Sequence, residues 1–592
     1  MSFFGDRKLL PVLLLLLGQV GLYLWMAPRG FEFTDESFYL LNYLYWRELL
    51  GTVSFFGAYF ELPFRLLGES IAGIRIFSLV LLLVSSGFFT REVLRYCARR
   101  DGHSVPAPLA RSLVLVGMAA SLNYFGYVST ARAPSYNLLA LLTMLLSTGL
   151  LLRLLDSALS PRGAQIVAVW YGLVIGACGM GKATSGVLLV ASHVLFFALA
   201  NHDWRLSRLL QLLVLSMVGA SVNALLLQWV HPHWFAVLLE GVSLVHTTDE
   251  RGLLALANTL RWEVQEIAPG LLLWGAGAVV ACGLAARWIG AKHRSAMSVL
   301  IVGLVGAVNA FWMSDARGQL WLPLLGLGVF LLWLVEYLAR QSARWTKTDT
   351  TALTLTGLFL VLPLAYSFGT NMSVLRHSQM AAVFVVVAMA LRLRSLHRAG
   401  LLVTPALYTC LAVLCVPTLL IQVRAAWDVD YTHRQLSSLG RQTVPVSVGL
   451  VATTVLVDAT TRDTLRAVTD AARAAGFAPG TSMLDFTGDG PGLVYALGGR
   501  PLGVAWLTGG YAGSEATARQ IAARLPRSAL RAAWVLSSDD NPRAIKAWQE
   551  LLEPYVGANA HELVGAVVVH APYRWAPDSP DATTIKIWRP RK

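Results

Sequence analysis

Two adjacent carboxylates, Asp35 and Glu36, are the residues of this chain whose position best suits acid–base chemistry. They follow the first long apolar run, residues 9–27, and so stand where a buried helix would meet water. A carboxylate at such a boundary can take a proton from an acceptor hydroxyl within hydrogen-bond reach. The pair can equally serve only as favourable negative charge at the start of a helix, so both interpretations stay open here.

Basic residues near the ends of other apolar runs could hold an anion opposite these carboxylates. Arg132 and Lys182 each end such a run, and charged side chains at membrane depth are usually functional. Side chains this close to an end can also extend to the water surface. Two further polar segments carry Arg317 and the pair Arg376 and His377, and a guanidinium offers phosphate bidentate hydrogen bonds. Arg317 could equally well pair with a neighbouring aspartate instead of a substrate. His377 could equally well contact a lipid headgroup.

Motifs for metal or nucleotide binding are weak in this sequence. The five cysteines lack metal-ligand spacing, so neither a zinc site nor a disulfide framework is predicted. Histidines and acids within 231–250 match no strong signature, which favours a solvated loop. The segment 485–492 follows a predicted strand but lacks a required glycine, and Pro491 removes an amide donor. We therefore predict no metal ligands, and a turn that starts a helix at 485–492.

The composition places these residues in a membrane protein. Of the 592 residues, 56% are apolar and 14% are charged, which is unusual for a soluble domain. Because a spanning helix needs about 20 mostly apolar residues, we predict about thirteen spans. They cover residues 9–27, 71–90, 112–130, 135–153, 166–181, 183–200, 209–230, 268–286, 297–313, 319–338, 351–367, 379–391 and 401–423.

The basic residues predict the orientation of these spans. With a cytoplasmic N-terminus, every even-to-odd connection is basic, as the positive-inside bias requires, and most acids fall on the opposite connections. Asp35 and Glu36 are therefore predicted to lie outside the cytoplasm. The net charge of +14 is explained by orientation and solubility, so no nucleic-acid partner is predicted.

Two polar regions interrupt or follow the spans. The first outer loop, 28–70, contains aromatic amphipathic segments at 38–46 and 55–63 that suit helices lying among lipid headgroups. The chain is predicted to divide into a membrane domain, 1–423, and an extracytoplasmic α/β domain, 424–592. In that domain we predict strands at 446–457, 482–486, 532–537 and 562–570, and helices at 461–475, 514–523 and 543–552.

The order of these features resembles the GT-C superfamily of glycosyltransferases, nearest the branch of protein O-mannosyltransferases and lipid A aminoarabinose transferases. The likeness covers roughly residues 9–200. Its matching segments are 33–39, 61–64, 73–78, 130–134 and 179–184. The segment 61–64 departs from the usual small-residue and proline-rich run, which leaves the acceptor class open.

The resemblance implies a polytopic GT-C fold and an inverting transfer of a sugar from a polyprenyl-phosphate donor. The acceptor would be a hydroxyl of a glycan, lipid or protein on the periplasmic face of a bacterial inner membrane. By the same analogy Asp35 is the base, and Glu36 is the second candidate. The implied residues for the donor phosphate and substrate are Lys182, Arg376, Arg132, Glu61, Arg317 and His377. No cofactor is predicted, although some members use a metal and a divalent cation stays open.

Three other functions remain as alternatives. A transporter or flippase of lipid-linked sugars predicts charges inside several spans, whereas charges here collect at span ends. An O-antigen polymerase or ligase usually carries its functional arginines in a large late outer loop, and here the late element is the domain 424–592. A non-catalytic scaffold would leave Asp35, Lys182 and Arg376 freely replaceable.

Overall fold

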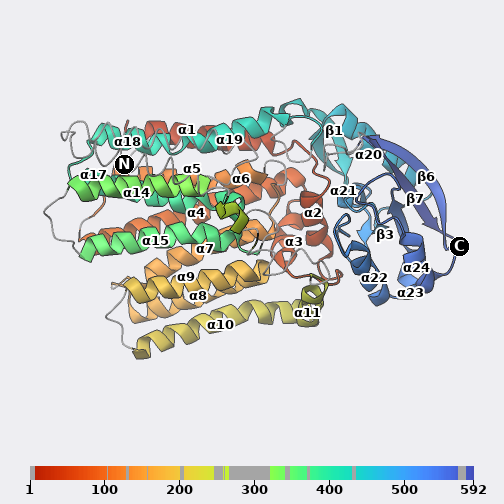
Figure 1. Cartoon of the computed structure of the whole chain (residues 1–592), viewed down its shortest axis with the longest axis horizontal. Helices are drawn as coiled ribbons and strands as arrows, with labels where there is room; N and C mark the ends of the chain where they lie inside the picture. Colours follow the sequence, from red (N-terminus) through yellow and green to blue (C-terminus); the bar gives the residue numbers. More distant parts are fainter. Residues whose placement is uncertain are drawn as a thin grey trace.

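The structure, a computed structural model, is a bundle of long helices with an α/β domain at one end (Figure 1). The predicted spans 268–286 and 297–313, like Arg317, lie outside the residues that the structure describes. The described residues are 7–102, 104–128, 132–156, 158–200, 206–245, 258, 261–265, 321–339, 347–369, 374–429, 435–570 and 582–591.

Every other predicted span falls on a helix, which confirms a multi-pass α-helical membrane protein. Within the described ranges, eight helical segments are long and apolar enough to cross a membrane. The bundle consists of α1 (Leu10–Met26), α4 (Ile71–Asp101), α5 (Ala107–Ser121), α6 (Asn123–Val128), α7 (Tyr136–Leu154), α8 (Pro161–Gly181), α9 (Ala183–Ala200), α10 (Leu206–Val230), α14 (Trp321–Ala339), α15 (Lys347–Ser367), α16 (Val374–Ser378), η3 (Gln379–Ala381), α17 (Ala382–Arg398), α18 (Thr404–Val413) and α19 (Val416–Trp427).

The amphipathic segments of the first loop, residues 28–70, are helices, as predicted. They are α2 (Asp35–Tyr45) and α3 (Phe56–Leu66), and with α11 (Trp234–Val245) they lie between the bundle and the α/β domain (Figure 1). The two loop helices pack through aromatic rings, for example Tyr43 against Phe64 with centroids 5.3 Å apart. This aromatic contact holds α2 against α3.

The C-terminal region is an α/β domain, as predicted. Its five-stranded sheet has the order β4-β3-β5-β7-β6, in which β3 pairs in parallel with β4 and β5, and β7 is antiparallel to β5 and β6. The elements are η5 (Leu439–Arg441), β1 (Val444–Val448), β2 (Thr453–Val457), α20 (Ala459–Ala474), β3 (Ser482–Asp485), α21 (Pro491–Ala496), β4 (Arg500–Pro501), α22 (Ser514–Arg524), α23 (Arg527–Ala532), β5 (Trp534–Ser537), α24 (Trp548–Val556), β6 (His561–His570) and β7 (Ala582–Pro590).

Three details of this domain differ from the prediction. Residues 446–457 are a two-stranded hairpin that turns at Gly449 and Ala452, both at positive φ. The helix expected from residue 543 begins only at Trp548, because the preceding segment packs against neighbouring loops instead. Strand β7 was not predicted, and it completes the sheet between β5 and β6.

The first loop and the α/β domain share one apolar core. Phe31 and Phe33 belong to the same buried cluster as Val448, Leu493 and Tyr495 of the domain. Backbone hydrogen bonds reinforce the contact, since the N–H of Gly492 donates to the carbonyl of Phe33 at 2.7 Å. The domain is therefore packed directly onto the segment that leads into α2.

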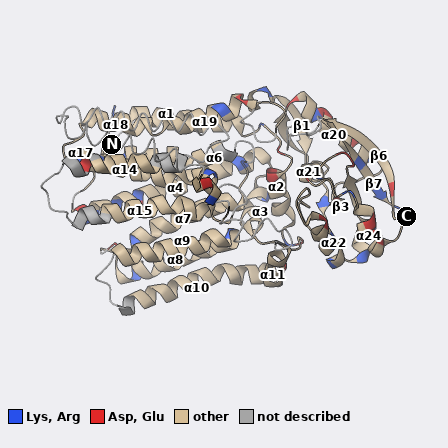
Figure 2. Ribbon diagram, in the orientation of Figure 1, with Lys and Arg blue, Asp and Glu red and all other residues tan. Residues whose placement is uncertain are grey.

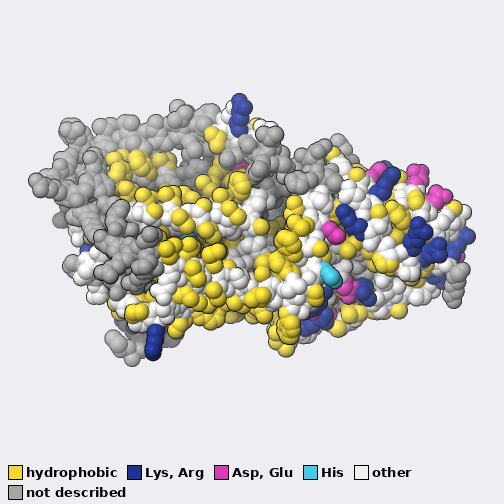
Figure 3. Space-filling model, turned by 90° about the horizontal axis from the view of Figure 1, so that it is seen from below, with side chains coloured by type: hydrophobic (Ala, Val, Ile, Leu, Met, Phe, Trp, Pro, Cys, Tyr) yellow, Lys and Arg dark blue, Asp and Glu magenta, His cyan; other side chains and the backbone are white. Residues whose placement is uncertain are grey.

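Charged residues lie mainly at the two ends of the bundle and along the α/β domain (Figure 2). Seen from below, apolar side chains cover much of the described helical part, while charges gather over the C-terminal domain (Figure 3). At the end far from that domain, buried acids pair with arginines of other helices. These pairs are Arg153 with Glu92, Arg99 with Asp156, Arg394 with Asp101, and Arg392 with Glu336.

Candidate functional site

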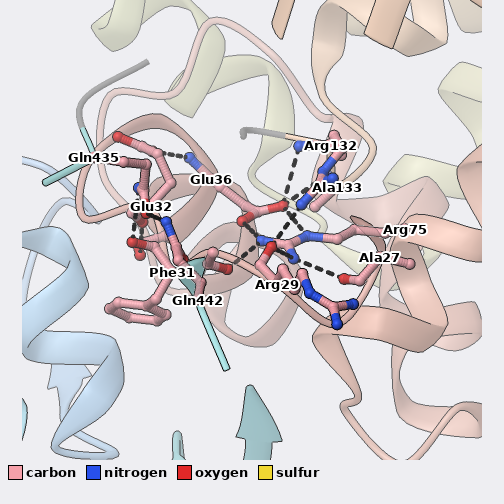
Figure 4. Close-up of polar contacts among 12 residues, drawn as sticks. Ala27, Arg29, Phe31, Glu32, Glu36, Arg75, Arg132, Ala133, Gln435 and Gln442 are labelled. Carbon is pink, nitrogen blue, oxygen red and sulfur yellow. Dashed lines mark hydrogen bonds and ion pairs between the residues drawn. The ribbon is translucent and has the colours of Figure 1, made fainter. Parts of the chain in front are cut away.

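Glu36 lies at the centre of a buried network at the start of α2 (Figure 4). Its Oε1 accepts hydrogen bonds from Arg75 Nε at 2.8 Å and from the backbone N–H groups of Arg132 at 3.1 Å and Ala133 at 2.9 Å. Its Oε2 pairs with Arg75 Nη2. Because both oxygens are occupied in this way, Glu36 joins α2 to α4 and to the segment before α7.

Arg75 connects the same carboxylate to the end of α1. Its guanidinium is fully buried and donates at 2.8 Å to the carbonyls of Ala27, Arg29 and Gly30. These carbonyls lie at and just beyond the last turn of α1, where no intrahelical donor can reach them. Arg75 therefore fixes the path of the chain from the first span to the acidic pair.

Asp35 is the first residue of α2 and, unlike Glu36, is partly exposed. Ahead of it, Glu32 accepts the N–H groups of Thr34 at 3.1 Å and Glu36 at 2.7 Å, which satisfies donors of the first helical turn. Tyr39 lies one turn further on. Burial first, and then the charge of Asp35, raises the pKa of Tyr39 well above its usual value. Asp35 therefore stands at the edge of a largely buried aromatic environment.

Arg132 is fully buried beside this network and is only partly satisfied. One nitrogen, Nη2, donates to the carbonyl of Arg29 at 2.6 Å. Nε and Nη1 have no hydrogen-bond partner among the described residues. Burial and the nearby charge of Arg75 lower the pKa of Arg132 to about 9. A buried cation with unpaired donors is costly, and an anion bound against it would remove that cost.

Lys182 occupies the turn between α8 and α9 at the same end of the bundle (Figure 1). Its ammonium donates to the carbonyl of Tyr366 at 2.7 Å and lies over the Tyr366 ring, 5.0 Å from the centroid. Burial lowers the pKa of Lys182 to about 7. The side chain is thus poised between its charged and neutral forms near neutral pH.

His377 joins the Lys182 cluster from α16. Its ring stacks on Tyr366 with centroids 5.4 Å apart, and its Nε2 lies 3.3 Å from Oδ1 of Asn137. Arg376, the preceding residue, is partly buried. The N-terminus of α16 is held by Glu263, whose carboxylate accepts the N–H groups of residues 374 and 375 at 2.8 and 3.1 Å.

The first turn of α7 connects the acidic pair with the basic cluster. Tyr136 makes an edge contact with Tyr39 of α2, with centroids 6.3 Å apart, and the next residue is Asn137, which contacts His377. Sequence-predicted residues from four separate segments thus lie around one end of the bundle. They are Asp35, Glu36, Arg132, Lys182, Arg376 and His377.

Glu61 has its partners within the first loop. Its oxygens accept hydrogen bonds from Trp46 Nε1 at 2.7 Å and Arg65 Nε at 3.2 Å, and they pair with Arg47 at 2.6 Å. These donors lower the pKa of Glu61 against the opposing effect of its partial burial. The contacts join α2 to α3, while a substrate-binding role for Glu61 stays a prediction.

Sequence reasoning assigned no role to Arg75, Tyr366 or Glu263. A signal existed for Arg75, because it is a charged residue just inside a predicted span. Tyr366 contacts Lys182 through its backbone carbonyl and its ring face, and Glu263 caps the N-terminus of α16. No residue pattern in the sequence predicts contacts of these kinds. For metals, the described part of the chain contains no group of three or more His, Cys, Asp or Glu able to hold an ion.

Comparison with known proteins gives matches only among solved structures. No protein-family model and no curated protein matches the chain. The archaeal oligosaccharyltransferase AglB from Archaeoglobus fulgidus, in complex with an inhibitory peptide and a dolichol-phosphate, is similar over 91% of this chain and 70% of that chain, with 12% identity and a TM-score of 0.45. ArnT from Cupriavidus metallidurans, bound to undecaprenyl phosphate, is similar over 98% of this chain and 97% of that chain, with 13% identity and a TM-score of 0.42.

Both similarities are at low sequence identity, so the resemblance to GT-C glycosyltransferases stays a prediction. Because both TM-scores lie below 0.5, function is inferred below from the geometry of this chain alone. The decisive features of that geometry are the partly exposed Asp35 and the incompletely paired, buried Arg132.

Proposed function

We propose that the protein is an inverting glycosyltransferase that moves a sugar from a polyprenyl-phosphate donor to a hydroxyl acceptor. The proposal is supported above all by the buried Arg132 guanidinium, which offers Nε and Nη1 near the helix that starts with Asp35. Such a pairing of an anion site with a carboxylate suits a reaction that deprotonates one oxygen and releases a phosphate. Lys182, Arg376 and His377 add cationic or donor capacity at the same end of the bundle.

The transfer needs one displacement. The Asp35 carboxylate takes the proton of the acceptor hydroxyl, and the acceptor oxygen forms a bond to the anomeric carbon of the sugar. The bond between that carbon and the phosphate oxygen breaks, and both of its electrons leave with the lipid phosphate. Attack opposite the leaving group inverts the anomeric configuration. Arg132 and Lys182 stabilise the charge that develops on the phosphate.

Glu36 has a supporting role in this proposal. Its two oxygens already accept four hydrogen bonds from Arg75 and from the backbone of residues 132 and 133. These contacts hold three segments together, so both oxygens of Glu36 are committed to structural hydrogen bonds. We therefore assign proton transfer to Asp35 and the positioning of Arg132 to Glu36.

We further propose that the site faces the periplasm of a bacterial inner membrane, with residues 424–592 as the periplasmic domain. The support is electrostatic. Arginines of α4, α7 and α17 lie at the bundle end opposite that domain, and excess arginine marks the cytoplasmic side of spans. The N-terminus would then be cytoplasmic, and membrane lipids would surround the bundle.

The decisive experiment compares wild-type protein with Asp35→Asn and Arg132→Met in liposomes that contain the host's polyprenyl-phosphate sugars. We expect Asp35→Asn to abolish glycosidic bond formation while undecaprenyl phosphate still binds, and Arg132→Met to weaken that binding. The control is Asp463→Asn, an exposed carboxylate of α20 in the C-terminal domain. Full activity of Asp35→Asn would refute the assigned base. Movement of the lipid-linked sugar without a new bond would instead indicate a flippase.

A further inference from the structure

The sheet of the C-terminal domain has a topological switch point that the proposed reaction does not use. The chain leaves β3 for β4 on one side of it, and then returns to place β5 on the other side of β3. The loops that follow the parallel strands β3 and β5 therefore diverge. In open α/β sheets, ligands bind in the crevice outside the carboxyl ends of strands where this divergence occurs.

Polar side chains gather at this switch point. Asp485 is the last residue of β3, Asp489 belongs to the loop after it, and Asn541 belongs to the loop after β5. The Asn541 amide donates to Asp489 Oδ1 at 2.8 Å and to the Thr487 carbonyl at 3.2 Å, so it links the two loops. Close approach of these loops requires glycine at 488, because a Cβ there would lie 1.9 Å from the Arg543 carbonyl oxygen.

Within this cluster, Asp485 has one carboxylate oxygen in a hydrogen bond and one that is buried without a partner among the described residues. Its Oδ1 accepts hydrogen bonds from the N–H of Thr487 at 2.9 Å and from the Thr487 hydroxyl at 2.5 Å. Its Oδ2 has no hydrogen-bond partner in the described part of the chain, although the residue is only 8% exposed. Burial raises the pKa of Asp485 to about 6, against the effect of the Thr487 bonds. The chain thus holds an acceptor oxygen ready at a cost in stability, which is typical of functional positions.

Aromatic rings connect the cluster to the helix that begins with Asp35. Trp506 donates from Nε1 to the Gly488 carbonyl at 3.0 Å, and its ring lies 6.2 Å from that of Phe38 in α2. On the opposite flank, the N–H of Gly492 bonds to Phe33, two residues before Asp35. The switch point therefore lies against the same segment as the proposed base.

We propose that this switch point binds a neutral, hydroxyl-rich carbohydrate and forms part of the acceptor site of the transferase. The carboxylates of Asp485 and Asp489 accept hydrogen bonds from sugar hydroxyls. The Asn541 amide, whose two N–H bonds already hold Asp489 and the Thr487 carbonyl, adds the second lone pair of its oxygen as an acceptor. Trp506 offers apolar surface to the C–H face of a sugar ring. The binding stands on its own geometry, whereas its acceptor role rests on the proposed glycosyl transfer.

Two other ligand classes fit these residues less well. An anionic ligand would meet Asp485 and Asp489 at close range, where like charges repel. A metal ion needs several converging ligands, and within the described residues no group of three suitable side chains occurs. Neutral hydroxyl groups satisfy the acceptors without either difficulty.

The test uses the full-length protein in lipid nanodiscs, free of sugar-based detergents, on an array of neutral and anionic oligosaccharides. We expect binding to a subset of the neutral oligosaccharides. The dissociation constant should rise at least tenfold in Asp485→Asn and in Asp489→Asn, and should change less than twofold in Asp463→Asn. Binding to no oligosaccharide, preference for anionic ones, or equal affinity in all variants would overturn the proposal.

The variant Asp35→Asn separates this inference from the proposed reaction. We expect it to bind the same oligosaccharides as the wild type while transferring no sugar. If the wild type binds them but transfers nothing to them, the site is a carbohydrate site and its acceptor role is refuted. If transfer occurs while Asp485→Asn and Asp489→Asn keep full affinity, the reaction stands and the switch point has no part in it.

Discussion

Asp35 and Glu36 are neighbours in the chain but differ in their burial. Glu36 is 1% exposed and pairs with the fully buried Arg75, whereas Asp35 is partly exposed at the helix start. Residue types alone made the two carboxylates equivalent candidates. The structure distinguishes them by burial and by the contacts of Glu36 with α4 and with the segment before α7, which residue types do not encode.

We predict that Glu36→Gln destabilises the protein strongly. The amide keeps the shape of the side chain but removes its charge, so the buried Arg75 guanidinium loses its counterion. Breaking one partner of a buried ion pair costs about 3–5 kcal/mol. The measurement is the thermal unfolding midpoint in detergent, with Asp35→Asn as the control of matched chemistry. An unchanged midpoint in Glu36→Gln would contradict the structural role.

Lys182 predicts a pH dependence of donor binding. Its pKa is lowered to about 7 by burial, so the charged form that attracts a phosphate is lost as the pH rises through 7. The fall in the protonated fraction from pH 6 to 8.5 corresponds to roughly 30-fold weaker binding. The matched control is Lys182→Arg, whose guanidinium stays charged and should remove this dependence.

The measurement is the dissociation constant of undecaprenyl phosphate at both pH values. Comparison with Lys182→Arg cancels any titration of the lipid phosphate itself. Identical pH profiles for the wild type and for Lys182→Arg would show that Lys182 does not hold the phosphate.

The raised pKa of Asp485 predicts that the stability of the folded protein depends on pH. Its folded pKa of about 6 lies above the ordinary value of 3.8, so the folded state binds more protons between these values. Stability therefore falls as the pH rises from about 4 to about 6, by roughly 3 kcal/mol in total. Asp485→Asn should flatten this decline and be the more stable protein at pH 7. A decline of the same size in the variant would be inconsistent with a buried, protonatable Asp485.

At the scale of elements, short segments position the basic residues. α16 spans only residues 374–378, too few to be stable alone. Its N-terminus is held instead by Glu263, which is fully buried and accepts two backbone N–H groups. A segment far away in the sequence thus sets the position of Arg376 and His377.

We predict that Glu263→Ala weakens donor binding without slowing the chemical step. Loss of a helix cap costs about 1 kcal/mol and loosens α16, so the KM for the lipid donor should rise while kcat stays nearly constant. The control is Gln265→Ala, an exposed neighbour on the same short helical segment. A fall in kcat with unchanged KM would argue against a role in holding α16.

The elements themselves could be predicted well where hydrophobic periodicity is strong. The spans and the helices α2 and α3 follow from long apolar runs and from aromatic amphipathic segments. The turn of the β1–β2 hairpin and strand β7 could not, because they depend on positive φ angles and on partners elsewhere in the sheet. The same limit applies to the site, where Arg132 is visible in the sequence but its unpaired nitrogens are not.

At the scale of the whole molecule, the first loop and the C-terminal domain are packed as one body. Gly492 lies so close to Phe33 that an added Cβ would stand 2.6 Å from the Phe33 Cα. The contact links the start of α21 to the residues that lead into Asp35. Disturbing it should therefore affect both stability and the reaction.

We predict that Gly492→Ala separates the domain from the first loop. The clash is with backbone, which cannot yield as a flexible side chain can, and overpacking of this kind costs about 1–3 kcal/mol. Faster proteolysis of the C-terminal domain in the folded protein is the readout, together with lower transfer activity. Gly565→Ala in β6, where an added Cβ meets only ordinary contacts, is the control. Equal proteolysis of both variants would be evidence against the shared core.

This shared core also orders events during synthesis. The Gln435 side chain bonds to the Phe31 carbonyl, and these two residues are 404 positions apart in the chain. At about 5–20 residues per second, a ribosome needs roughly 20–80 s to cover that distance. Throughout that interval Phe31 and Phe33 lack the domain side chains that complete their core, such as Leu493 and Tyr495. The lipid headgroup region accepts amphipathic aromatic helices. We therefore expect the first loop to lie in that region until the C-terminal domain has been synthesised.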